Sequence, residues 1–108
     1  MREGLERLLL NGQDNALLRF GLGNAYFKEE NYAAAAEHLQ KAVAHNPQYS
    51  AAWKLLGKAW QALGQTTQAD AAWQQGMQVA HANGDSQTVK EITVFLKRLH
   101  KAQQGPVA

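Results

Sequence analysis

The chain has 108 residues, enough for one domain with a modest hydrophobic core. Hydrophobic residues make up 45% of it, charged residues 19%, and the formal net charge is +2. This balance is ordinary for a globular chain and lacks the concentrated basic patch of a nucleic-acid binder. The absence of cysteine excludes disulfides, thiolate nucleophiles and cysteine metal sites.

The first residues place acidic side chains among leucines, unlike the apolar stretch of a signal peptide. No apolar run approaches the roughly 20 residues that are needed to cross a bilayer. We therefore expect a cytoplasmic protein that has no membrane partner.

In chain order, the first expected helix covers residues 2–10. The second follows an N-cap at Asp14 or Asn15, whose side-chain oxygen can accept a backbone N–H, and runs to about residue 29. A third, alanine-rich helix covers residues 32–45. The Asn-Pro pair after it ends this helix, because proline restricts the residue before it to extended conformations.

The stretch from residue 51 to residue 64 is expected to be the fourth helix, with Ser50 as its N-cap. Its apolar and small residues recur at helical spacing and share one stripe: Trp53, Leu56, Gly57, Trp60 and Leu63. A glycine within that stripe indicates that another helix approaches closely.

A fifth helix is expected over residues 66–82, followed by a turn that stops one helix and starts another. Asp85 or Ser86 is the expected N-cap of the sixth helix, which covers residues 87–101. Apolar residues recur along this last helix at helical spacing, and basic residues gather near its end, where they suit the helix dipole.

The pattern of the fourth helix recurs 34 residues earlier in the chain, and the match continues into the helix that follows each copy. The residues paired by this shift are Leu22 with Leu56, Gly23 with Gly57, Tyr26 with Trp60, Ala35 with Ala69 and Leu39 with Trp73. A fixed period of this size is typical of helical repeat arrays.

The two copies resemble the tetratricopeptide repeat, which reads W-x2-L-G-x2-Y and continues with alanine, an aromatic residue, alanine and proline. The resemblance assigns these positions to the structural core: Leu22, Gly23, Tyr26, Ala35, Leu39, Ala42, Pro47, Trp53, Leu56, Gly57, Trp60, Ala69 and Trp73. Arg19, Gly76 and His81 depart from the family pattern. All three tryptophans are expected to be core residues.

The resemblance implies an all-α fold, a right-handed solenoid of about six antiparallel helices in a single domain over residues 1–102. The expected parts are an N-terminal half-repeat or cap (1–13), repeat 1 (16–49), repeat 2 (50–83), a C-terminal capping helix (86–101) and a flexible tail (103–108). Open ends of such stacks need caps for solubility. The starting methionine favours a native cap over a fragment of a longer array.

Tetratricopeptide proteins receive a peptide or a partner's helix on the concave surface made by the first helices of successive repeats. The resemblance therefore implies a non-enzymatic protein-interaction module without a cofactor. The groove residues carried over by position are Leu17, Phe20, Asn24, Phe27, Lys28, Ala51, Lys54, Lys58 and Gln61. The expected ligand places an apolar anchor on the phenylalanines and acidic residues or a C-terminal carboxylate near Lys54 and Lys58. The alternative is an ordinary solvated helix face.

One subclass of the family grips a C-terminal carboxylate with a lysine and asparagines at set groove positions. Asn24 occupies one of these positions, whereas Phe20 and Leu55 stand where the lysine and a further asparagine are expected. The resemblance therefore does not extend to this carboxylate clamp.

No catalytic or metal site is expected. The serines are explained as helix caps, and neither G-x-S-x-G nor a phosphate loop is present. His38 and His45 lie seven residues apart, too far along a helix to share an ion without further ligands.

Two alternative functions stay open. A self-associating module would pack its leucine-rich N-terminal helix, including Leu5, on a second copy to form a homodimer. Nucleic-acid binding through the basic last helix is less favoured, and no nucleic-acid partner is expected.

Overall fold

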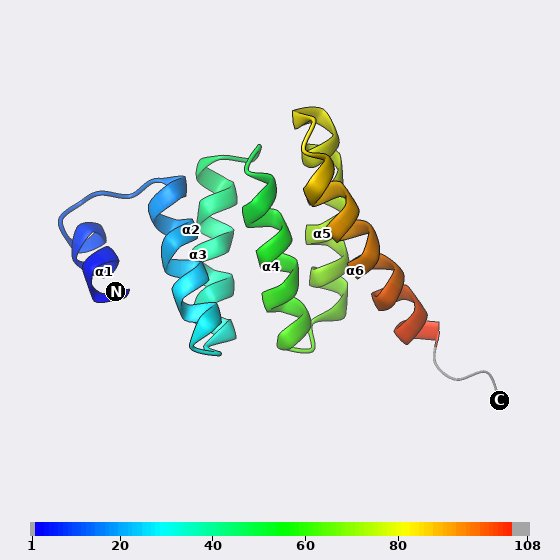
Figure 1. Cartoon of the computed structure of the whole chain (residues 1–108). Coiled ribbons are helices and arrows are strands. Elements are labelled where there is room, and N and C mark those ends of the chain that lie inside the picture. The colour runs from blue at the N-terminus through cyan, green and yellow to red at the C-terminus, as the bar shows by residue number, and fades with distance from the viewer. Residues whose placement is uncertain (1, 105–108) are drawn as a thin grey trace.

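The computed structural model describes residues 2–104, and within them the chain forms six α-helices and no β-strand (Figure 1). In order they are α1 (Arg2–Leu10), α2 (Ala16–Lys28), α3 (Tyr32–His45), α4 (Ser50–Ala62), α5 (Thr66–Asn83) and α6 (Ser86–Gln104). The helices stack into a rod of 55 × 30 × 18 Å. None of these helices combines the length and apolarity needed to span a membrane.

The bounds of α1 and α3 agree with the sequence prediction, and the largest difference is at the end of α6. The predicted flexible tail begins too early, because Gln103 and Gln104 belong to α6. Glutamine is a good helix former, so the sequence has no physical reason to end the helix before them. The rest of the predicted tail, residues 105–108, lies outside the described residues.

The stack is built from two antiparallel hairpins, α2 with α3 and α4 with α5. In each hairpin a glycine of the first helix faces the same-register side chain of the second, Gly23 against Leu39 and Gly57 against Trp73. A Cβ atom on either glycine would lie within 3.0 Å of that side chain. The same glycine-to-side-chain contact therefore recurs after 34 residues, so the period of the sequence is also the period of the helix packing.

The turns of the two hairpins also correspond. Gly64 has a left-handed backbone (φ 74°) in the second hairpin, and Glu30 has the same conformation (φ 62°) 34 residues earlier. A residue with a Cβ costs roughly 1–2 kcal/mol in this conformation. The packing of α2 against α3 therefore imposes the turn on a residue that does not favour it.

Most residues of the predicted apolar stripes form the interior, but Leu63 follows the end of α4 and is 37% exposed. The large side chains that are completely enclosed are Trp73, Leu22, Leu39 and Ile92. Trp53, Trp60 and Tyr26 pack against this core with one side still exposed, so the expectation of enclosed tryptophans holds in full only for Trp73.

Two predicted roles need correction. Pro47 is exposed and is not a core residue; it ends α3, and its carbonyl accepts a hydrogen bond from Trp53 Nε1 at 2.8 Å. Ser50 is not the cap of α4 either, because Tyr49 occupies the cap position. The Ser50 hydroxyl instead donates to Asp85 Oδ2 at 2.7 Å, which ties the start of α4 to the start of α6.

The remaining caps follow the sequence. Asn15 accepts the backbone N–H of Leu18 at 2.8 Å and is the N-cap of α2. At the start of α6, Asp85 Oδ1 accepts the backbone N–H of Thr88 at 3.1 Å. Of the two alternatives for that cap, the structure therefore selects Asp85.

Arg19 replaces the first aromatic of the repeat with a charge that is only 7% exposed. Its Nε and Nη2 donate to both carboxylate oxygens of Asp14 at 2.7 and 2.8 Å, and its Nη1 donates to His38 Nδ1 at 3.1 Å. The bonds from Arg19 hold the pKa of Asp14 well below its usual value. Burial, together with the charge of Arg19, lowers the pKa of His38, so its neutral ring serves as the acceptor.

Candidate functional site

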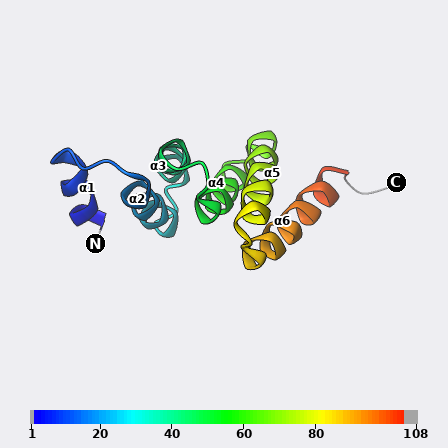
Figure 2. The same ribbon diagram turned by 90° about the horizontal axis from the view of Figure 1, so that it is seen from above.

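The helices α2, α4 and α6 lie along one side of the stack, and α3 and α5 lie along the other (Figure 2). α4 approaches both α2 and α6, whereas no Cα atom of α3 lies within 8 Å of a Cα atom of α5. The stack therefore bends so that α2, α4 and α6 are on its inner side. We call the exposed and half-buried residues of these three helices on that side the inner face.

One end of the inner face is apolar. Leu17, in the first turn of α2, is 71% exposed. Phe20 lies one turn further and packs its ring on Tyr49, with the ring centroids 4.9 Å apart. Ala51, at the start of α4, is half-buried on the neighbouring helix. These three residues make up the apolar end of the inner face.

Lys58 is at the centre of the inner face. Its Nζ lies 5.6 Å from the ring centroid of Phe27 on α2 and 5.6 Å from that of Phe95 on α6. A cation over an aromatic ring gains about 0.5–1 kcal/mol at such exposed sites. Within residues 2–104 no carboxylate forms an ion pair with Lys58. The ammonium is therefore positioned by two rings and is available to a carboxylate of a ligand.

The two rings are themselves held in place. Phe27 makes an edge contact with Tyr32, with centroids 5.1 Å apart. Phe95 lies 5.3 Å from the Trp73 ring, which is completely buried. The position of Lys58 consequently depends on α2, α4 and α6 together.

Lys54 has a different environment from the one predicted. Its Nζ forms an ion pair with Glu91 Oε1 of α6 at 3.0 Å. The sequence prediction assigned acidic ligand groups to Lys54 and Lys58 alike, but Lys54 already has a carboxylate partner within the chain. Glu91 and Phe95 are site residues that the sequence analysis missed, because α6 lacks the repeat motif that identified the other helices.

The other predicted groove residues surround this centre. Asn24 is half-buried, and its side-chain amide has no hydrogen-bond partner within the described part of the chain. Lys28 and Gln61 are exposed at the far ends of α2 and α4. The inner face thus combines an apolar end, a central cation and free polar side chains.

The self-association alternative named Leu5, which packs partly within the chain, whereas Leu8 and Leu10 of α1 are 38% and 86% exposed. Leu5 points onto α2, where a Cβ atom on Gly21 would be 3.2 Å from Leu5 Cδ1. Arg2 donates to Glu29 at 2.8 Å, and Tyr26 donates its hydroxyl hydrogen to Glu6. Leu5 is therefore used for packing within the chain.

Two further histidines, besides His38, take part in hydrogen bonds. His45 Nε2 lies 2.9 Å from Asp14 Oδ1, and His100 Nε2 lies 2.8 Å from Asp70 Oδ1. Within residues 2–104, no group of three or more histidine and acidic side chains is arranged to hold a metal ion.

Two family models, both described as tetratricopeptide repeat, match residues 26–90 and residues 2–48. The chain is also similar to TPR repeat-containing protein PA0015 of Pseudomonas aeruginosa. The two are 54% identical over 103 residues, which cover 95% of this chain and 98% of that relative.

Solved structures show the same arrangement of helices. Protein BPP2914 from Bordetella parapertussis matches with a TM-score of 0.82 and 46% identity, covering 94% of this chain and 89% of that one. The first TPR of Spaghetti (RPAP3), bound to the HSP90 peptide SRMEEVD, matches with a TM-score of 0.74 and 25% identity. That match covers 84% of this chain and 68% of the other.

Proposed function

The chain belongs to the tetratricopeptide repeat family, and we propose that its inner face binds an extended or helical segment of another protein. The family fold is a general protein-interaction module and, as a rule, a non-enzymatic scaffold. The similar domain of Spaghetti is bound to a peptide. In this chain the observation that carries the proposal is the Lys58 ammonium between Phe27 and Phe95, which has no ion-pair partner within residues 2–104.

The chemistry of the inner face restricts the kind of ligand that can bind there. A carboxylate, either on an acidic side chain or at a chain terminus, supplies a negative charge that can pair with the Lys58 ammonium. The apolar end at Leu17 and Phe20 favours an apolar residue in the ligand about 10 Å from that carboxylate, because Phe20 lies seven residues before Phe27 on α2. Lys54 makes a poor second anchor, because a ligand carboxylate would have to compete with Glu91. The ligand therefore needs one well-placed acidic group and not an acidic run.

Selection of peptides from a displayed random library on the full chain tests the proposal. We expect enrichment of sequences that combine an acidic residue or C-terminal carboxylate with an apolar residue about three positions away in an extended segment. Lys58→Gln should raise the dissociation constant of the selected peptides by about tenfold or more, because a charge-assisted hydrogen bond contributes about 1.5–3 kcal/mol. Fluorescence anisotropy with a labelled peptide measures the dissociation constant.

Lys41→Gln is the matched control, since it removes the same charge from an exposed position of α3 on the other side of the stack. It should leave the dissociation constant unchanged. Equal affinity of Lys58→Gln and the unmodified chain, or equal losses in both variants, would reject the inner face as the binding site.

A further inference from the structure

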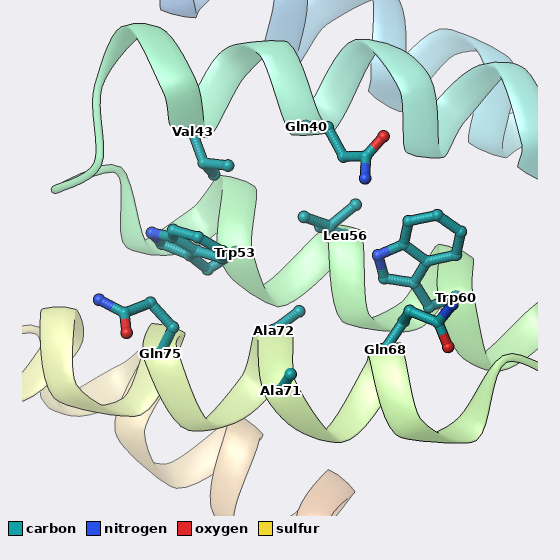
Figure 3. A pocket seen from close by; sticks show the side chains of 9 residues that line it. All are labelled: Gln40, Val43, Trp53, Leu56, Trp60, Gln68, Ala71, Ala72 and Gln75. Atoms are coloured by element: carbon teal, nitrogen blue, oxygen red, sulfur yellow. The ribbon is translucent and has the colours of Figure 1, made fainter.

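On the side of the stack opposite the inner face, a hollow of about 620 Å³ lies in the valley between α3 and α5 (Figure 3). Residues of α4 form its floor, including Trp53, Leu56 and Trp60. It exists because α3 and α5 do not approach each other and because α5 turns small side chains, Ala71 and Ala72, toward the valley. We call it the outer hollow.

The lining of the outer hollow defines the chemistry of an occupant. Two indole rings flank Leu56 on the floor, and glutamine amides at Gln40 and Gln68 stand at the edge (Figure 3). None of the residues that line it carries a charge. An occupant that matches this surface is uncharged, apolar where it meets the floor, and able to bond with amide groups.

The indole N–H groups supply a second, independent observation. Trp53 Nε1 and Trp73 Nε1 donate to the carbonyls of Pro47 at 2.8 Å and Lys54 at 3.0 Å. Trp60 Nε1 points toward the outer hollow in Figure 3 and has no acceptor within residues 2–104. Indole N–H groups beside apolar surface usually find a hydrogen-bond partner, so this donor is available to a ligand carbonyl.

The spacing of the two indoles selects a backbone conformation. Trp53 and Trp60 are seven residues apart on one helix, about 10.5 Å along its axis at about 1.5 Å per residue. In a polyproline II segment, residues three apart lie on the same face and are about 9.3 Å apart. In a β-strand, residues three apart span a similar length but face opposite sides. A ligand helix has the right spacing, but its backbone carbonyls are already bonded internally, whereas those of polyproline II are free.

We propose that the outer hollow binds a proline-rich segment of another protein in the polyproline II conformation. Two prolines three residues apart pack on Trp53 and Trp60, and a carbonyl between them accepts a hydrogen bond from Trp60 Nε1. The rim glutamines donate to neighbouring carbonyls of the segment. Aromatic-lined grooves recognise such segments because the ligand is already extended and loses little conformational entropy on binding.

The test is a titration of the ¹⁵N-labelled full chain with decaproline whose ends are blocked, followed through the three indole N–H signals. The Trp60 signal should shift saturably, while the signal of the buried Trp73 should not move. Trp60→Phe keeps a ring but removes the donor, and its titration is followed through the Trp53 signal; we expect binding to weaken about fivefold, as the loss of one hydrogen bond does.

Ala71→Arg places a long charged side chain in the outer hollow from an exposed position of α5 and should abolish the response. Ala44→Arg is the matched control, because Ala44 is equally exposed on α3 but does not line the hollow. Lys58→Gln should also respond like the unmodified chain, which separates this site from the inner face.

Several results would overturn the proposal. They are the absence of a saturable Trp60 shift, an equal response in Ala71→Arg, and an equal shift with a glycine-serine peptide of the same length. A Trp60 shift that appears on concentrating the chain without any peptide would identify a second copy as the occupant instead.

Discussion

Gly57 packs against the indole of Trp73 so closely that a residue with a Cβ atom does not fit at position 57. A Cβ atom there would come within 3.0 Å of three indole atoms, and the indole is held by its hydrogen bond to Lys54 and by Phe95. We therefore expect Gly57→Ala to destabilise the fold. Overpacking costs about 1–3 kcal/mol, which outweighs the roughly 1 kcal/mol that alanine gains in a helix.

The free energy of unfolding in urea measures this effect, and Gly4→Ala is the control. Gly4 is also helical, but nothing lies within 4 Å of a Cβ atom placed on it. That substitution should be neutral or slightly stabilising. If Gly57→Ala stabilised the chain as Gly4→Ala is expected to, the close contact between α4 and α5 would be wrong.

The contribution of the Asp14–Arg19 ion pair to stability can be tested at low pH. Its pKa is lowered in the folded chain, chiefly by Arg19, so the ion pair contributes stability above the ordinary pKa of 3.8, and this is lost as the pH falls through the folded value. Asp14→Asn removes the contribution. The difference in melting temperature between the two proteins should be present at neutral pH and shrink steadily below about pH 4. A difference that is constant down to about pH 2 would contradict the ion pair.

At the scale of elements, α6 covers the end of the stack that α5 would otherwise expose. Ile92, Leu96 and Leu99 pack in one cluster with Trp73. We infer that α6 is the C-terminal capping helix, since an open repeat end exposes apolar surface. By the same reasoning we propose that α1 is the half-repeat or cap at the other end.

Ile92 and Val94 form a matched pair on α6. Ile92 is completely buried, and Ile92→Ala should lower the free energy of unfolding by about 2–5 kcal/mol. Val94 is 42% exposed, and Val94→Ala should change it by no more than about 0.5 kcal/mol. Both values come from chemical denaturation. Similar losses in the two variants would mean that α6 does not pack on the stack through this face.

The sequence predicts the helices well because their signals are local. Capping residues such as Asn15 and the Asn46-Pro47 pair act within one turn. The 34-residue period also indicates that Gly23 and Gly57 have equivalent contacts in the second helix of each repeat. Contacts made between distant elements have no such signal. The Lys54–Glu91 ion pair and the Lys58–Phe95 contact depend on how closely α6 approaches α4, which its unrepeated sequence does not show.

Partial burial is also hard to predict from a motif. The family positions of Trp53 and Trp60 predict packing, and both rings do contact the core. Their exposed sides arise from the separation of α3 and α5, which is a property of the curved stack. The inner face could therefore be predicted in outline from the repeat, whereas the outer hollow could not.

At the scale of the whole molecule, the bend of the stack gives the chain two unlike surfaces. The inner face has apolar side chains around Lys58, a cation without an ion-pair partner in the described part of the chain, and the outer hollow is apolar and uncharged. They should bind ligands of different chemistry without competing, because α4 separates them.

Binding of partner segments on the inner face around Lys58 can be observed residue by residue. The most direct measurement is a map of backbone amide shifts in the ¹⁵N-labelled full chain on titration with a peptide selected as above. We expect the largest shifts at Phe27, Lys58 and Phe95, which lie in three different helices. Largest shifts confined to α3 and α5, or scattered without a maximum on α2, α4 and α6, would contradict binding on this face.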